Sequence, residues 1–342
     1  MTYVLSSVVQ KGGVGKTLIT ANLGYVLSQM GYRVCLIDSD SQNTLSSLCN
    51  LLPKEYNSKE DFELFGLQDI FEYFLECEKI QKPMDIKIIE KAVCRPKYRK
   101  LNTRKKEGWE EKEFGFDLIG SDIGLANYEQ ILTRTGNQGG LALYKIVKVM
   151  VESELWDVII VDCPPSLTTL SYNGLTCVAG ATNGNGAILV PINLEISTLR
   201  GARNLIRATG EIQELLWNMG ILHKGILGLI KNEYVERFKI QQDFEAIVND
   251  FFPVKPFKTA IPKKTSCDVA HKMGMMYAQY DKVAYNAFES LAKEILKELK
   301  KNESMKEPNI VVELGASAMD DLFKNSIKTN NKDKIRTRSK NE

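Results

Sequence analysis

Residues 10–17 read QKGGVGKT, an order of residue types that predicts a phosphate-binding loop. Three glycines let consecutive backbone N–H groups turn toward a ligand without Cβ clashes. The amine of Lys16 can reach terminal phosphates, and the hydroxyl of Thr17 can bind Mg²⁺. The loop follows the apolar run 3–9 and precedes a helical pattern, so a helix N-terminus would face the phosphates. We therefore expect nucleoside triphosphate binding; the alternative is a glycine-rich turn with incidental lysines.

The loop departs from the usual P-loop at two positions. Gln10 stands where the ordinary loop has a glycine, and Lys11 adds a second cation. Two lysines this close repel each other unless a polyanion lies between them. We therefore expect Lys11 to serve nucleotide together with Lys16.

Two short apolar runs, 34–37 and 158–161, end in aspartates. Asp38 and Asp40 follow the first run, and Asp162 follows the second. Runs this rich in β-branched residues are typical of buried parallel strands, whose carboxyl ends form the ligand-binding edge of an open sheet. The three carboxylates should therefore converge on a Mg²⁺ ion and an attacking water beside Lys16. The alternative is that these aspartates only end their strands in turns.

The elements that must position these groups alternate along the chain. They predict an α/β fold: a single P-loop-type sandwich with a mostly parallel twisted β-sheet flanked by helices, plus a helical and charged insertion. Helices are expected at 16–30, 65–80, 84–94, 141–155, 199–219, 238–251 and 282–300, and strands at 3–9, from 33, 156–162, 187–192 and 225–231. The charged stretch 95–113 is expected to be a solvated loop, with a nucleic-acid contact as the alternative.

Length and composition agree with one large domain. The chain has 342 residues, of which 44% are hydrophobic, enough for a substantial core over residues 1–300. Residues 53–115 form the insertion, and residues 301–342 are expected to be a basic, disordered extension, with a DNA-touching tail or partner peptide as alternatives. Seven scattered cysteines without a CxxC pair indicate reduced thiols. Without a leader or a run of about 18 apolar residues, the protein is expected to be cytoplasmic.

Three segments resemble the deviant Walker A, A′ and B motifs of the ParA/Soj/MinD ATPases. They are KGGVGKT at 11–17, DSDSQ at 38–42 and VDCPPS at 161–166. Gln42 makes the second motif most similar to the ParA (Soj) partition branch. Further segments in family order extend the resemblance over about residues 1–300, with 53–115 weakly matched. Ser41 and Leu18 replace a proline and a threonine that are frequent in the family.

The resemblance implies an ATP-bound homodimer with Mg²⁺. Lys11 would reach across to the partner subunit's ATP, and Asp40 would position the hydrolytic water. The implied catalytic residues are Lys11, Lys16 and Asp40, and the implied metal residues are Thr17, Asp38 and Asp162. The implied nucleotide-binding residues are Lys11, Gly12, Gly13, Val14, Gly15, Lys16, Thr17, Leu18, Ile261, Pro262 and Lys263, with the last three against adenine.

The resemblance also implies a DNA-partition ATPase. ATP would join two subunits, the dimer would bind DNA nonspecifically, and slow hydrolysis stimulated by a centromere-binding (ParB-like) protein would release it at the nucleoid. A net charge of only +2 requires a local basic patch for DNA. The candidates are Arg200, Arg203 and Arg207 on one helix face, and Lys231, Arg237 and Lys239 in the next strand–helix connection. An ordinary solvated helix face is the alternative.

Other members of the resembled group offer rival functions. A MinD-like membrane-positioning ATPase should end in an amphipathic helix, whereas residues 328–342 are polar, so no membrane is expected. A relative that positions a protein cargo fits the sequence as well as a partition ATPase does. An iron–sulfur carrier ATPase would need a CxxC pair. The first strand begins at Tyr3, so no N-terminal helix-turn-helix and no operator repression are expected.

Overall fold

The computed structural model describes residues 1–51, 66–101, 109–193, 195–235, 245, 248, 252–303 and 307–308. Their centre is an eight-stranded sheet of order β10-β9-β8-β1-β7-β2-β6-β3. Every pairing is parallel except that of β3 with β6, at one edge. The strands are β1 Tyr3–Ser7, β2 Val34–Asp38, β3 Val93–Cys94, β6 Asp117–Ile119, β7 Val158–Asp162, β8 Gly186–Ile192, β9 Ile226–Tyr234 and β10 Pro256–Pro262. The predicted fold class is confirmed.

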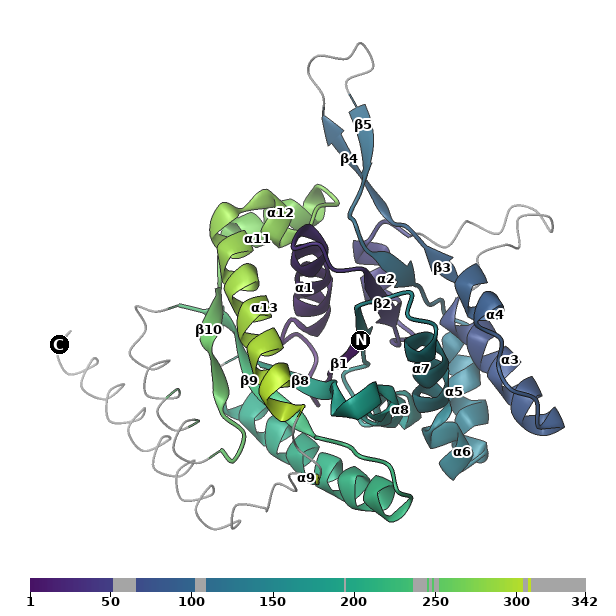
Figure 1. The fold of residues 1–342 in the computed structure, drawn as a ribbon. Coiled ribbons are helices and arrows are strands. Elements are labelled where there is room, and N and C mark those ends of the chain that lie inside the picture. Colours follow the sequence, from purple (N-terminus) through teal and green to yellow (C-terminus); the bar gives the residue numbers. More distant parts are fainter. Residues whose placement is uncertain are drawn as a thin grey trace, which may run out of the picture.

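Helices cover both faces of this sheet (Figure 1). One face carries α1 Lys16–Gln29, α2 Thr44–Leu48, α11 Thr265–Lys272, α12 Tyr277–Tyr280 and α13 Lys282–Asn302. The other carries α3 Leu67–Ile80, α4 Ile86–Lys91, α5 Leu125–Arg134, α6 Asn137–Gly140, α7 Ala142–Glu152, α8 Thr169–Cys177 and α9 Ile196–Asn218. A hydrophobic core lies on each face of the sheet. Consecutive strand residues point into these two cores alternately: Leu36 of β2 is buried in one core and Ile37 in the other.

The expected helices at 16–30, 65–80, 141–155, 199–219 and 282–300 are confirmed as α1, α3, α7, α9 and α13. The expected helix at 84–94 is wrong at its end, because α4 stops at Lys91 and Val93 pairs with Ile119 as the edge strand β3. The expected helix at 238–251 and most of the 301–342 extension lie outside the described residues.

The expected solvated loop at 95–113 is also wrong. Strands β4 Lys97–Leu101 and β5 Trp109–Glu113 form an antiparallel hairpin that projects from the body (Figure 1). Opposite charges face each other across it at Arg99 and Glu111, which stabilises the pairing. The ring of Tyr98 lies 5.1 Å from that of Phe114, so an aromatic contact holds the base of the hairpin.

Candidate nucleotide site

The phosphate-binding loop connects β1 to α1 and has the backbone that a phosphate requires. Gly13 and Gly15 have φ of +77° and +83°, left-handed values that side chains disfavour. A Cβ at Gly15 would lie 2.1 Å from Nδ2 of Asn232, and this Nδ2 donates to the Val14 carbonyl at 2.8 Å. No side chain of the described residues caps the N-terminus of α1, which leaves its first N–H groups available to an anion.

The other residues of the loop are arranged around this turn. Gly12 is exposed and Val14 is buried. Leu18 is half-buried and packs against the hydrophobic core on the face of the sheet that α1 covers. Lys16, the first residue of α1, is buried although it is charged. A buried lysine needs an anionic neighbour, and the charge of Lys16 partly offsets the rise that burial causes in the pKa of Asp162.

Two carboxylates lie side by side at the ends of neighbouring parallel strands. Asp38 of β2 pairs in register with Asp162 of β7, and both are buried. Oγ1 of Thr17 donates to Oδ2 of Asp162 at 2.6 Å, and Oγ1 of Thr20 donates to Oδ1 at 3.2 Å. Burial and the charge of Asp38 raise the pKa of Asp162 to about 7. Burial raises the pKa of Asp38 to about 6 against the lowering effect of hydrogen bonds from Ser46.

This donor set fits Mg²⁺. Carboxylate and hydroxyl oxygens are the ligands that hard cations prefer, and two adjacent buried carboxylates are stabilised when a cation lies between them. Several buried polar atoms around the loop also have no hydrogen-bond partner among the described residues, as expected where a ligand supplies the partner. They include Gln10 Oε1, Ser39 Oγ and Asn232 Oδ1.

Asp40 lies on a tight turn directly after β2. The Ser39 N–H donates to the Asp162 carbonyl at 2.8 Å, and the Asp40 N–H donates to Oδ1 of Asp38 at 3.2 Å. Oδ1 of Asp40 accepts the Gln42 N–H at 3.0 Å. The structure thus brings Asp38, Asp40 and Asp162 together next to the phosphate-binding loop.

Lys11 contacts the start of α9 rather than its own loop. Its Nζ lies 2.7 Å from Oε2 of Glu195, 2.7 Å from Oγ of Ser197 and 3.2 Å from Oγ1 of Thr198. The helix packs closely here, because a Cβ at Gly201 would lie 2.9 Å from the Gln10 carbonyl. The first turn of α9 is therefore in direct contact with the phosphate-binding loop, through hydrogen bonds and close packing.

The segment 261–263 ends β10 beside the end of β9, the strand that carries Asn232. Pro262 pairs with Tyr234, and the Pro262 carbonyl accepts the Tyr277 hydroxyl at 3.2 Å. Ile261 is buried in the core, whereas Lys263 is exposed and its Nζ lies 3.0 Å from Glu233. Of this segment, Pro262 and Lys263 are the residues whose side chains reach the surface.

The basic candidates do not all lie on one surface. Arg200 and Arg207 are exposed on α9, Arg203 is half-buried, and Arg207 Nε lies 3.2 Å from Glu211. The expectation that Lys231 lies in a strand–helix connection is wrong, because β9 continues to Tyr234. Lys231 is buried there, 2.5 Å from Glu245. Arg237 and Lys239 lie outside the described residues.

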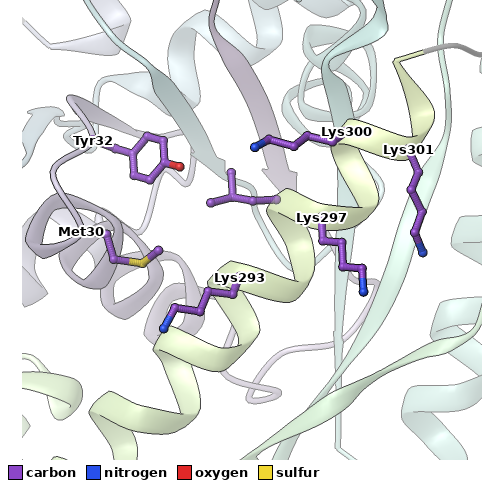
Figure 2. Close-up of a pocket in the computed structure, with 7 residues that line it drawn as sticks. Met30, Tyr32, Lys293, Lys297, Lys300 and Lys301 are labelled. Atoms are coloured by element: carbon purple, nitrogen blue, oxygen red, sulfur yellow. The ribbon is translucent and has the colours of Figure 1, made fainter.

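A groove of about 570 Å³ lies at the opposite end of α1, between Met30, Tyr32 and the last turns of α13 (Figure 2). Lysines line it, but Lys293 pairs with Glu289 and Lys301 with Glu298. Lysines in the last turn of a helix also stabilise its dipole. Since α1 spans about 21 Å at 1.5 Å per residue, the groove is remote from the phosphate-binding loop.

Several residues of the site carry no signal in the sequence. Asn232 and Glu195 contact the loop from 218 and 184 positions away, and Thr20, Ser46 and Ser121 look like ordinary polar residues. The hydrogen bonds of Thr20 and Ser46 to Asp162 and Asp38 become visible only once the strands are paired.

A parallel sheet that presents a phosphate-binding loop beside buried carboxylates defines a P-loop nucleotide-hydrolysing protein. A family model described as "AAA domain" (AAA_31) matches residues 2–221. The chain belongs to this family, and within it to the ParA/Soj/MinD ATPases.

Individual relatives cover most of the chain. The chromosome-partitioning ATPase Soj of Treponema pallidum is 26% identical over 290 residues, 84% of this chain and 94% of that protein. The sporulation initiation inhibitor protein Soj of Bacillus subtilis is 27% identical over 84% of this chain and 95% of that protein. Cobyrinic acid a,c-diamide synthase from Mycobacterium smegmatis, solved with ADP and magnesium, shares the fold. Its TM-score is 0.62 at 23% identity, covering 90% of this chain and 98% of that one.

Proposed function

We propose that this chain is an ATP-dependent DNA-partition ATPase. ATP would join two subunits, the dimer would bind DNA nonspecifically, and Mg²⁺-dependent hydrolysis stimulated by a centromere-binding (ParB-like) protein would release it at the nucleoid. The likeness to Soj proteins supports the partition role. The observation that carries the proposal is Lys11, a second loop lysine held by α9 through contacts that a polyanion can displace.

The chain's own residues divide the work at the nucleotide. Backbone N–H groups of the loop and the amine of Lys16 would bind the β- and γ-phosphates. Thr17, Asp38 and Asp162 would hold Mg²⁺, directly or through water, and a bound Mg²⁺ supplies charge neutralisation for the phosphates. Asp40 would orient the attacking water, and its place on a constrained turn supports this role.

Asn232 is the best candidate for selecting adenine. Its Nδ2 is committed to the Val14 carbonyl, while its Oδ1 is buried and has no partner among the described residues. A free acceptor of this kind matches the amino group of adenine, which guanine lacks at that position. Pro262 ends the neighbouring strand β10 and Lys263 follows it; both would lie against the base.

Lys11 would exchange Glu195 for the phosphates of the partner subunit's ATP. The Lys11 and Glu195 side chains are 26% and 59% exposed, and exposed ion pairs contribute only about 0–1 kcal/mol. A triphosphate carries far more charge than one carboxylate, so the exchange is favourable when a second subunit brings its nucleotide close.

The DNA surface would begin on α9, directly after the turn that holds Lys11. Arg200 and Arg207 are its exposed members, with Arg203 between them and Arg237 and Lys239 further along the chain. Phosphate contacts of this kind do not read base sequence. Since the first turn of α9 contacts Lys11, movement of Lys11 into the dimer interface would also displace the start of this helix.

Retention on DNA of random sequence, with ATP, ADP or no nucleotide, tests the proposal. We expect retention only with ATP. No described helix is long and apolar enough to cross a bilayer. Anionic liposomes, run in parallel, test peripheral binding. Retention on liposomes instead of DNA would favour a membrane-positioning ATPase, and retention on neither would favour positioning of a protein cargo.

A further inference from the structure

Ser121, which lies just after β6, is hydrogen-bonded to Asp40 directly and linked to Asp38 through one other residue. Its Oγ donates to the backbone carbonyl of Asp40 at 2.9 Å. Its N–H donates to Oγ of Ser46 at 3.0 Å, and that Oγ donates to Oδ2 of Asp38 at 2.7 Å. One residue outside the motif therefore contacts the water-positioning turn directly and the metal-binding carboxylate through Ser46.

The other hydrogen bonds of the Asp40 turn are mostly local. The Asp40 carbonyl also accepts the Asn43 N–H at 2.9 Å, and Asn43 has a left-handed φ of 46°. Ser41, which follows Asp40, leaves the backbone free of the restriction that a proline would impose. Ser121 thus adds a hydrogen bond from the segment after the neighbouring strand β6 to a turn whose other hydrogen bonds are mostly local.

The residues around Ser121 are held from the opposite side. The Leu67 N–H donates to the Gly120 carbonyl at 2.9 Å, and Nε2 of Gln68 lies 3.2 Å from Oδ2 of Asp122. Both contacts come from the first turn of α3, in the insertion. Ser121 therefore lies between α3 and the Asp40 turn, and the contacts of its neighbours Gly120 and Asp122 with α3 fix the position of its hydroxyl.

We propose that Ser121 is a positioning residue that sets the Asp40 turn for hydrolysis, an inference that rests on the proposed ATPase function. Water attack needs the carboxylate within a few tenths of an ångström of its productive place, so loosening the turn lowers the rate of the chemical step. Nucleotide binding uses the phosphate-binding loop, which Ser121 does not contact, so binding should not change.

The test measures single-turnover ATP hydrolysis and ATP affinity in the full chain. Loss of one neutral hydrogen bond in Ser121→Ala should lower the hydrolysis rate by about three- to tenfold. ATP affinity should stay within about twofold of wild type, because no phosphate contact is removed. Ser121→Thr keeps the hydroxyl and should recover most of the rate. Ser290→Ala deletes an exposed hydroxyl of α13 that donates to the Asn286 carbonyl, and it should change neither quantity.

The outcomes separate this inference from the proposed function. A wild-type hydrolysis rate in Ser121→Ala overturns the positioning role. So does a parallel loss of rate and affinity that Ser121→Thr does not recover, since that pattern indicates a structural role. If wild type hydrolyses ATP but binds no DNA, the partition role is contradicted. The hydrolysis rates of wild type and Ser121→Ala would then still test the positioning role. Wild type without any ATP turnover overturns both.

Discussion

The Nζ atom of Lys11 lies 2.7 Å from Oε2 of Glu195, although 184 positions separate the two residues in the chain. The contact joins the phosphate-binding loop to the first turn of α9 within one subunit. In the proposed dimer, Lys11 would serve the second subunit's nucleotide, and Glu195 would occupy its amine until that nucleotide arrives.

Glu195→Gln should make dimerisation easier. It keeps the size of the side chain and removes the charge that competes for Lys11. Dimers should therefore form at an up to about fivefold lower concentration of a nonhydrolysable ATP analogue, because an exposed ion pair contributes at most about 1 kcal/mol. Analytical ultracentrifugation measures this shift. Glu298→Gln, which breaks the exposed Lys301 pair on α13, is the matched control. Weaker dimerisation in Glu195→Gln would show that Glu195 supports the dimer instead of opposing it.

Lys16→Ala should abolish ATP binding, because it removes the charge that compensates the β- and γ-phosphates. Equilibrium binding of Mg-ATP checks this. Lys293→Ala, in the groove at the far end of α1, removes the same charge and should bind as wild type does. Unchanged affinity in Lys16→Ala would mean that the phosphate-binding loop is assigned wrongly.

Asp40→Ala should bind ATP with nearly normal affinity but hydrolyse it at least about a hundredfold more slowly, because positioning of the water matters mainly in the transition state. An ATP-bound dimer should accumulate. Single-turnover hydrolysis and sedimentation with ATP measure the two effects. Wild-type turnover would move the catalytic role to another residue.

His223 should make the folded state sensitive to mild acid. Its Nε2 lies 2.7 Å from the Leu175 carbonyl, and its Nδ1 accepts the Gly225 N–H at 3.1 Å, an arrangement that suits the neutral ring. Burial lowers its pKa below the usual 6.5. The unfolded chain therefore binds a proton that the folded chain excludes, and stability falls as pH drops below about 6.5.

The comparison of wild type with His223→Gln isolates this effect. Asp38 and Asp162, whose pKa values are raised, contribute the opposite slope in both proteins, so they cancel in the difference. From about pH 7 to about pH 5, the stability advantage of wild type should shrink by up to about 1.4 kcal/mol per pH unit. Denaturant unfolding measures it; His271, whose pKa is also lowered by burial, is present in both proteins, so its contribution cancels as well. An advantage that stays constant with pH would contradict a neutral buried ring.

The motifs could be predicted from the sequence because their chemistry is local. The spacing of residues 10–17 predicts a phosphate-binding loop, and Asp38 and Asp162 each end a recognisable apolar run. Parallel pairing then brings the two carboxylates together without further information. Phosphate and metal candidates are therefore accessible from spacing and strand pattern alone.

The partners of these motifs could not be predicted, because they come from distant segments. Asn232 is 218 positions from Val14, and no periodicity marks it. The short strand β3 has only Val93 and Cys94, too few residues for an alternation to show. In the hairpin, the basic residues of one strand face acidic residues of the other. These pairs are far apart in the sequence, so the pattern of Lys97–Glu113 alone predicts a solvated loop.

The arginines of α9 should act only after the dimer has formed. Arg200→Ala with Arg207→Ala should weaken binding to all DNA sequences alike and flatten the salt dependence by about one unit of slope per lost phosphate contact. Lys293→Ala with Lys297→Ala, in the groove, is the control. A truncation after Lys301 belongs in the same titration. If only the truncation abolishes binding, the C-terminal extension is the DNA surface and α9 is not.

Lys11→Ala tests the central claim most directly, because it separates nucleotide binding from the cross-subunit step. Its sedimentation with a nonhydrolysable ATP analogue, with and without DNA, is the measurement. We expect the variant to bind the analogue as a monomer, to form no dimer and to stay off DNA, since the partner subunit's phosphates would lack a cation at a desolvated interface. A normal nucleotide-dependent dimer retained on DNA would contradict the account.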